Sequence, residues 1–314
     1  MATNVLLTID TELLWSPDVT RRSWQEALAR SFDPANVGIP YQLAKLAEHR
    51  LDAVFFVDPM PALHFGIEPV KRMVSLILEA GQSIELHLHP QWSRLVDGDP
   101  TTSFELNGYP EEEQRALIAQ ACELLMAAGA PRPAAFRAGS YAANDATLRA
   151  AAALGFRYDS SHNGSQHPWP SSIGLPADQI TPLRYENIIE VPVTLIRDRT
   201  GLRHLQICAV SMREMRAALY HAAQRAHPVV NIVSHSFELA TRSGKHVNRT
   251  HRQRFDDLCA FLDVHRADMP TRNFASLDIG KLGREAEPLP SSALRTIARQ
   301  AEQLWSNLYE ERGA

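Results

Sequence analysis

The sequence predicts an α/β fold, a seven- or eight-stranded parallel barrel of alternating strands and helices with an appended C-terminal helix. Short apolar runs alternate with longer amphipathic stretches over most of the chain, which is typical of strand–helix–strand units in a parallel sheet. Seven or eight such runs favour a closed or nearly closed barrel over the alternative, an open doubly wound sheet. The 314 residues, 45% of them hydrophobic and 22% charged, provide enough apolar surface for one large core.

The elements follow from these runs in chain order. Short runs rich in β-branched, aromatic and leucine residues predict strands at 5–10, 53–57, 84–89, 134–137, 156–159, 188–195 and 229–234, with a weak strand at 274–277. Amphipathic spacing predicts helices at 41–50, 70–80, 111–128, 145–154, 212–225 and 252–265, and Gly155 is expected to end the fourth of these. A helix at 292–308 follows a polar tail. We therefore expect a barrel domain over 1–280 and a helical extension over 281–314, with loops 96–109 and 163–182 helping to form a substrate cleft.

Charge and cysteine content exclude several classes of protein. The net charge of -4 and pI near 6.4 argue against nucleic-acid binding, which needs a basic face. The three cysteines are far apart in an odd number without a CxxC pair, so we expect reduced thiols and no disulfide framework. Neither a secretory signal nor an apolar run of about 20 residues is apparent, and we expect a cytoplasmic protein without a membrane span.

Acidic side chains come at the end of the first predicted strand. Because side chains alternate along a strand, Thr8, Asp10 and Glu12 would share one face. Two carboxylates on one face repel each other unless a cation or a shared proton intervenes. A solvated turn is the alternative explanation.

The third predicted strand contains two histidines on one face. In the run from Glu85 to Pro90, alternation directs Glu85, His87 and His89 to the same side. Two imidazoles spaced in this way can bind a common metal ion. A metal site is favoured over a hydrogen-bonded structural pair, because two buried histidines at a strand end are uncommon by chance.

Two later strands also end in polar side chains. Arg137 precedes Ala138 and Gly139, and His235 follows the strand at 229–234. A buried arginine normally pairs with a carboxylate, and a single histidine at such a position is more often structural than catalytic. Four strand ends nevertheless carry polar residues: acids on the first of these, two histidines on the second, an arginine on the third and a histidine on the fourth. Such a cluster is typical of a hydrolase active site on a barrel.

These four segments together resemble the motifs of the polysaccharide deacetylase superfamily, the NodB homology fold of carbohydrate esterase family 4. The sequences TIDTE (8–12), ELHLHPQW (85–92), RAGSY (137–141) and VSH (233–235) occur in the family's order. Two departures are present: Thr11 separates acids that are adjacent in the family, and the second histidine is His89, with Gln91 at the usual position. Both spacings keep the side chains on one strand face. The sequence is most similar to the WalW-like branch, which is linked to bacterial surface-polysaccharide biosynthesis.

The resemblance implies an enzyme that removes an acetyl or other acyl group from an N-acylated sugar with the help of a divalent ion, most simply zinc. Glu12, His87 and His89 would be the metal ligands, and Asp10 would accept the proton of the attacking water while paired with Arg137. His235 would protonate the departing amine. The backbone near Tyr141 would stabilise the oxyanion, and Trp92, or else Trp15 or Trp169, would stack on the sugar.

Two other functions remain open from the sequence. One is a metal-dependent amidohydrolase that cleaves a non-sugar C–N bond, although such enzymes usually have His-x-His on the first strand. The other is a non-catalytic carbohydrate-binding barrel, which the altered motifs would allow.

Overall fold

The protein is described from a computed structural model that covers residues 2–15, 18–93, 104–277, 282 and 285–311. Its main sheet has eight strands in the order β10-β1-β2-β3-β4-β5-β7-β6. All neighbouring strands are parallel except β6 and β7. The strands are β1 (Asn4–Thr11), β2 (Val54–Val57), β3 (Ser83–Leu88), β4 (Ala135–Ala138), β5 (Tyr158–Asp159), β6 (Leu183–Tyr185), β7 (Ile188–Glu190) and β10 (Val229–His235).

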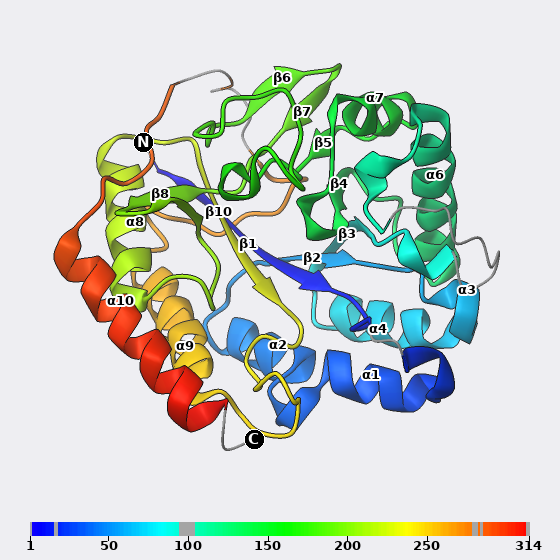
Figure 1. The fold of residues 1–314 in the computed structure, drawn as a ribbon, viewed down its shortest axis with the longest axis horizontal. Coiled ribbons are helices and arrows are strands. Elements are labelled where there is room, and N and C mark those ends of the chain that lie inside the picture. The colour runs from blue at the N-terminus through cyan, green and yellow to red at the C-terminus, as the bar shows by residue number, and fades with distance from the viewer. Residues whose placement is uncertain (1, 16–17, 94–103, 278–281, 283–284, 312–314) are drawn as a thin grey trace.

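The strand order confirms the predicted class and excludes the doubly wound alternative. Strands that follow one another in sequence lie side by side, as in a barrel, whereas a doubly wound sheet reverses its order in the middle. Helices surround the curled sheet (Figure 1). They are α1 (Trp24–Phe32), α2 (Ile39–Glu48), α3 (Ala62–Phe65), α4 (Glu68–Glu79), α6 (Glu111–Ala127), α7 (Asp145–Ala153), α8 (Met212–Gln224), α9 (Arg249–Val264) and α10 (Ala293–Trp305). Helix α1 lies in a segment without a predicted element and begins with a capping box between Ser23 and Glu26.

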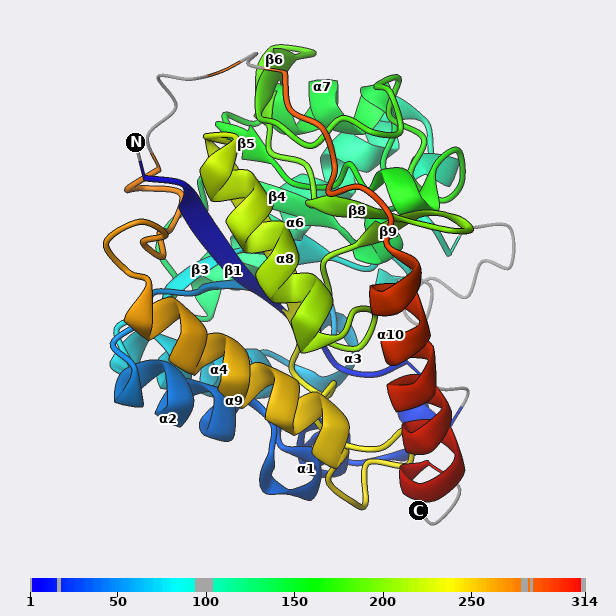
Figure 2. The same cartoon turned by 90° about the vertical axis from the view of Figure 1, so that its left-hand side faces the viewer.

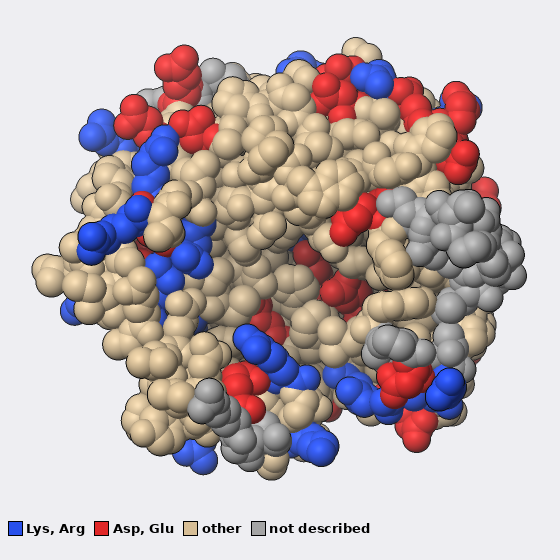
Figure 3. All heavy atoms as spheres, viewed as in Figure 1, with Lys and Arg blue, Asp and Glu red and all other residues tan. Residues whose placement is uncertain are grey.

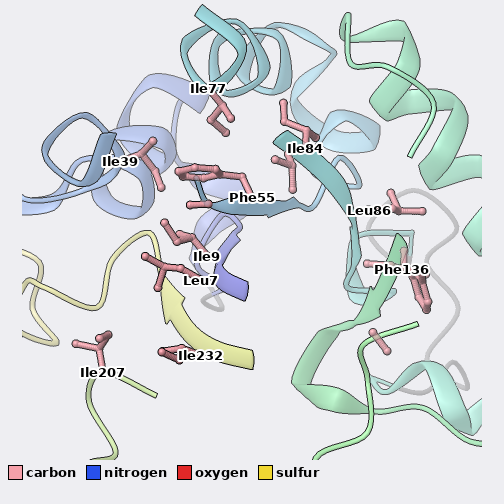
Figure 4. Packing of buried hydrophobic residues seen from close by; sticks show 14 of the residues in the cluster. Leu7, Ile9, Ile39, Phe55, Ile77, Ile84, Leu86, Phe136, Ile207 and Ile232 are labelled. Carbon is pink, nitrogen blue, oxygen red and sulfur yellow. The ribbon is translucent and has the colours of Figure 1, made fainter. Parts of the chain in front are cut away.

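The two faces of the sheet bury different kinds of side chain. On β1, Val5, Leu7 and Ile9 belong to the large core between sheet and helices, where Figure 4 shows Leu7, Ile9 and Phe55 close to Ile39 and Ile77. Leu6 faces the other way, into the barrel interior. Thr8 and Asp10 lie on the same face of β1 as Leu6 and are also buried. The interior is therefore apolar at one end and polar at the other.

The predicted eighth strand at 274–277 is not formed. This segment is a turn, whose Phe274 ring packs in the interior against Phe56 at 5.9 Å and Tyr158 at 5.1 Å between centroids. Apolar composition alone does not distinguish a strand from a turn whose side chains fill the barrel interior, since both need apolar residues.

The segment predicted as one strand at 188–195 is divided at Pro192, which has no N–H for a sheet ladder. Its second part becomes β8 (Leu195–Asp198), which pairs with β9 (Gly201–His204) in a separate hairpin. This hairpin region fills the space beside β10. Thr194 donates its N–H to the Asn231 carbonyl at 3.1 Å, and the Ile207 N–H donates to the Val233 carbonyl at 3.2 Å.

The C-terminal helix α10 lies along the outside of the barrel near α8 (Figure 2). Its Arg299 is buried and pairs with Asp198 at 3.0 Å and Glu214 at 3.2 Å, and Glu302 accepts a hydrogen bond from Arg254 at 2.8 Å. Such paired buried charges hold the helix in one position, because separating them would leave a charge unpaired. The domain boundary near residue 280 stays a prediction, and it adjoins residues 278–281 and 283–284, which are outside the described part of the chain.

Among the described residues, no helix combines the length and apolar character that crossing a membrane requires.

Candidate functional site

The predicted polar residues meet at the carboxyl ends of neighbouring strands. Asp10 of β1 lies directly opposite His235 of β10, and His87 of β3 lies opposite Arg137 of β4. In Figure 3 the surface is hollowed near its middle, and acidic side chains lie in the hollow. Barrel folds commonly place their chemistry at this end of the strands.

Arg137 and Asp10 form an ion pair inside the barrel. The Arg137 Nη1 donates to Asp10 Oδ1 at 2.6 Å and to Thr8 Oγ1 at 3.0 Å, and the guanidinium also donates to the Ser160 carbonyl and hydroxyl at 3.1 and 3.0 Å. The Phe56 ring lies 4.2 Å from its central carbon. Arg137 is not exposed at all, so Asp10 is the carboxylate that balances its buried charge.

Glu12, His87 and His89 come together as a possible metal-binding group. One ligand atom from each residue lies within 4.8 Å of the other two. Glu12 Oε2 is 3.5 Å from His87 Nε2 and also contacts His89 Nε2. The two imidazole rings are 4.9 Å apart and nearly perpendicular. Two imidazoles and one carboxylate are a donor set that divalent zinc accepts.

The hydrogen bonds around this group also fit a divalent ion. His87 Nδ1 donates to the Arg137 carbonyl at 2.9 Å, so in the neutral ring the lone pair is on Nε2, which faces Glu12. Metal-binding histidines usually donate their other N–H in this way. Glu12 Oε2 is buried and faces the Nε2 atoms of both imidazoles. A Cβ on Gly139 would lie 2.5 Å from the His89 ring, so only glycine leaves room for His89 there.

Strong electrostatic coupling is present within the group. Burial raises the pKa of Glu12, but the charges of His89 and His87 and their hydrogen bonds hold it well below its usual value. Burial lowers the pKa of His89, but the Glu12 carboxylate outweighs it and raises this pKa to about 9. In the protein alone, a proton on His89 therefore compensates the Glu12 charge, and a divalent ion would replace it.

His235 is held by neighbours that the sequence analysis did not identify. Gln206 Nε2 donates to His235 Nδ1 at 3.1 Å and to Glu238 Oε1 at 2.9 Å, and Glu238 Oε2 accepts the backbone N–H of His235 at 3.1 Å. The Glu238 carboxylate fixes the orientation of the Gln206 side-chain amide, because a flipped amide would place the Gln206 oxygen against Glu238 Oε1. His235 Nδ1 is therefore an acceptor and its proton is on Nε2, 3.9 Å from Asp10 Oδ2.

The hydrogen-bonded chain continues away from the site. Gln206 Oε1 lies 2.5 Å from His204 Nε2, and His204 Nδ1 lies 2.8 Å from the Ser165 hydroxyl. His204 and Gln206 are two polar residues without a recognisable motif, so the sequence did not indicate that they take part in the site. The loop at 163–182 therefore reaches the site through Ser165.

Tyr141 lies at the sharp turn that follows β4. Ser140 and Tyr141 both have left-handed backbone angles, with φ of 55° and 58°, which cost non-glycine residues energy and often mark functional turns. The Tyr141 ring is buried against Val193 and Val233, and burial raises the pKa of its hydroxyl. Burial of the ring holds this turn beside Arg137.

Trp92 cannot stack on a sugar, which corrects the prediction for this residue. It is fully buried and packs edge-on against Trp15 at 5.1 Å, because its apolar ring completes the core beneath the site. Trp15 is partly buried, whereas Trp169 is 61% exposed. Glu85 likewise stays outside the metal-binding group, since its Oε2 accepts the N–H groups of Ala134 and Ala135 at 2.7 Å.

A cavity of about 600 Å³ opens beside His235. Phe237 and Glu238 line it near the histidine, and Gln303 of α10 lines it together with Ser306 and Asn307, which follow that helix. Loops 96–109 and 163–182 are predicted to help form a substrate cleft, but their described residues, 104–109 and 163–182, do not line this cavity. Residues 94–103 lie outside the described part of the chain. The C-terminal extension thus contributes to a cavity wall.

The Gln206 hydrogen bond predicts a single tautomer of His235. In the intact protein, nitrogen-resolved NMR of the His235 ring at neutral or higher pH is expected to show a proton on Nε2 and none on Nδ1, with the signal identified by its loss in His235→Asn. Gln206→Leu removes the donor to Nδ1 and should give a mixture of tautomers. An unchanged tautomer in Gln206→Leu would contradict this role, and Gln224→Leu at the end of α8 is the control.

Comparisons with known proteins identify the fold. No family model and no curated protein matches the sequence. Among solved structures, a protein of Mycobacterium smegmatis assigned as a polysaccharide deacetylase is 22% identical, with 91% of this chain and 95% of that chain covered and a TM-score of 0.52. A family 4 carbohydrate esterase from Streptomyces lividans is 12% identical (91% and 98% covered, TM-score 0.43), and a peptidoglycan deacetylase from Bacillus subtilis is 13% identical (98% and 98% covered, TM-score 0.38). The likeness to the Mycobacterium smegmatis protein shows that the chain has the α/β fold of the polysaccharide deacetylases.

Proposed function

We propose that the protein is a metal-dependent deacetylase that hydrolyses the N-acetyl group of a sugar or polysaccharide. The observation that carries this proposal is the position of Glu12, His87 and His89 next to the buried pair of Asp10 and Arg137. This arrangement supplies a metal-binding group and a separate carboxylate at the strand ends of a deacetylase-like fold. A cytoplasmic site of action, a role in surface-polysaccharide biosynthesis and the WalW-like assignment are part of the same proposal.

Zinc is the ion that the donor set favours. When bound by Glu12, His87 and His89, a divalent ion would act as a Lewis acid that polarises the acetyl carbonyl and acidifies a water molecule.

Asp10 is the proposed proton acceptor. Its Oδ1 is occupied by Arg137, whereas its Oδ2 faces His235 across 3.9 Å. The free oxygen can therefore accept a proton from an attacking water while the guanidinium balances the charge and prevents the carboxylate from rotating. A general base must lie within hydrogen-bond reach of the proton it removes, and the fixed orientation of Asp10, with Oδ2 directed toward His235, supports this proposed role.

His235 and the turn at Tyr141 complete the proposed mechanism. The Nε2 of His235 faces the same space as Asp10 Oδ2 and borders the cavity, so it can transfer a proton to the amine as the C–N bond breaks. The backbone N–H of Tyr141 is proposed to stabilise the developing oxyanion. The cavity lined by Phe237 and the C-terminal helix would accept the remainder of the saccharide.

Acetate release tests this function. The protein is incubated with a panel of N-acetylated mono- and oligosaccharides, with added zinc or with a chelator. Zinc-dependent release of acetate is expected from at least one saccharide, and His235→Asn should release it more slowly. Binding of saccharides without any acetate release would instead support a non-catalytic carbohydrate-binding barrel.

Asp10 and Glu12 are predicted to have separate functions. Asp10→Asn should retain the metal and lose about 10²–10⁴-fold in turnover, which is the usual contribution of a general base. Glu12→Gln should lose metal affinity, and excess zinc should partly restore its rate, because a ligand has been weakened. Metal content by elemental analysis and initial rates check both variants. Loss of metal from Asp10→Asn, with retention of metal by Glu12→Gln, would show that the two functions are reversed. Asp52→Asn is the control, and the unfolding midpoint of each variant shows whether it is folded.

A further inference from the structure

A third carboxylate, Asp58, lies in the same row as the proposed metal ligands. The strand β2 runs between β1 and β3, and Val57 at its end is opposite both Thr11 and Leu86. The residues that follow Thr11, Val57 and Leu86 are Glu12, Asp58 and His87, and these three form the next row across the sheet. The Asp58 N–H extends the ladder by donating to the Thr11 carbonyl at 3.0 Å, so this row continues beyond the regular strand.

Asp58 also belongs to the interior face of the sheet. It follows Phe56 by two residues, and Phe56 belongs to the interior cluster and contacts Arg137. Alternation therefore directs Asp58 to the side of the sheet that contains Asp10, and Glu12 continues the same parity on β1. No sequence motif indicated this residue, because it stands alone between Val57 and Pro59.

One oxygen of Asp58 has no partner. Its Oδ1 accepts the Met60 N–H at 2.9 Å, which closes a local turn. Its Oδ2 is buried and has no hydrogen-bond partner, and the residue has no exposed surface. Burial raises the pKa of Asp58 to about 6, and the charges of His89 and His87 act in the opposite direction. These histidines are therefore close enough to favour its ionised form.

The charges around the proposed ion do not balance without Asp58. Asp10 and Arg137 neutralise each other, and histidines that bind a metal are neutral. A divalent ion with Glu12 alone would leave one uncompensated positive charge in a buried site, which is costly. Glu105 is another acid near His89, but it is only half-buried, whereas Asp58 has no exposed surface.

We propose that Asp58 is the second anionic residue of the metal centre and increases its affinity from outside the ligand group. Asp58 does not belong to the set whose ligand atoms lie within 4.8 Å of one another. It would therefore stabilise the bound ion by the negative charge on its carboxylate, whose Oδ2 has no hydrogen-bond partner. The inference rests on the proposed metal site and extends it to a residue of β2. Neighbouring residues of this kind typically change metal affinity by about 10–100-fold.

Asp58→Asn is the direct test. Asparagine keeps an oxygen for the Met60 N–H and nearly the same volume, and it removes only the charge and one acceptor. Zinc affinity is measured by competition with a chromophoric chelator, and the visible spectrum of bound cobalt is recorded. Asp58→Asn is expected to bind zinc about 10–100-fold more weakly than the intact protein. Asp52→Asn, at an exposed residue that precedes β2, is the matched control and should bind normally.

The outcomes separate this inference from the proposed function. Equal zinc affinity in Asp58→Asn and the intact protein would overturn the inference and leave Asp58 as a turn-closing residue. No zinc uptake by the intact protein would overturn both the inference and the metal site. Weakened binding in Asp58→Asn supports the inference even if no acetate is released from any saccharide, because affinity and spectrum are measured without turnover.

Discussion

The buried guanidinium of Arg137 is the constraint on which the rest of the site depends. A charge with no exposed surface must be balanced and fully hydrogen-bonded, and removal of one partner from such a pair typically costs about 3–5 kcal/mol. Asp10 and Thr8 of β1 and Ser160 after β5 meet this requirement from two segments that are far apart in the sequence. Ser160 in turn donates to the Val191 carbonyl at 3.0 Å and accepts from Asn231 at 2.9 Å, so the polar layer connects β10 with the end of β7 across the open side of the sheet.

This layer also positions the groups with proposed chemical roles. The Arg137 carbonyl accepts the His87 N–H, and the turn that follows β4 places Gly139 against His89 and Tyr141 beside Val233. One short strand therefore orients the proposed base directly and two proposed metal ligands through its backbone. The apolar cluster around Phe274 fills the other end of the barrel interior, and its Phe56 ring contacts the Arg137 guanidinium. The position of Asp58 completes the row of acidic and imidazole side chains across β1, β2 and β3.

Period-two and helical patterns were sufficient for most of the fold. The runs around Val5, Val54 and Ile84 became adjacent parallel strands, because strands buried on both faces have a strongly apolar composition. The division at Pro192 and the turn at Phe274 were not predicted, since an apolar run can fill a barrel without pairing as a strand. Alternation at strand ends predicted that His87 and His89 share a face, and the resemblance to the deacetylase family added Glu12 to them. Gln206, Glu238 and Asp58 were not predicted, because each acts through contacts made by distant segments and has no local pattern.

Zinc-edge anomalous diffraction from crystals grown with the metal tests the central claim most directly. The account predicts one strong peak bound by Glu12 Oε2 and the Nε2 atoms of His87 and His89, at distances of about 2.0–2.2 Å, with Arg137 still paired to Asp10. A peak bound by other residues, or no peak at this site in zinc-saturated crystals, would contradict it.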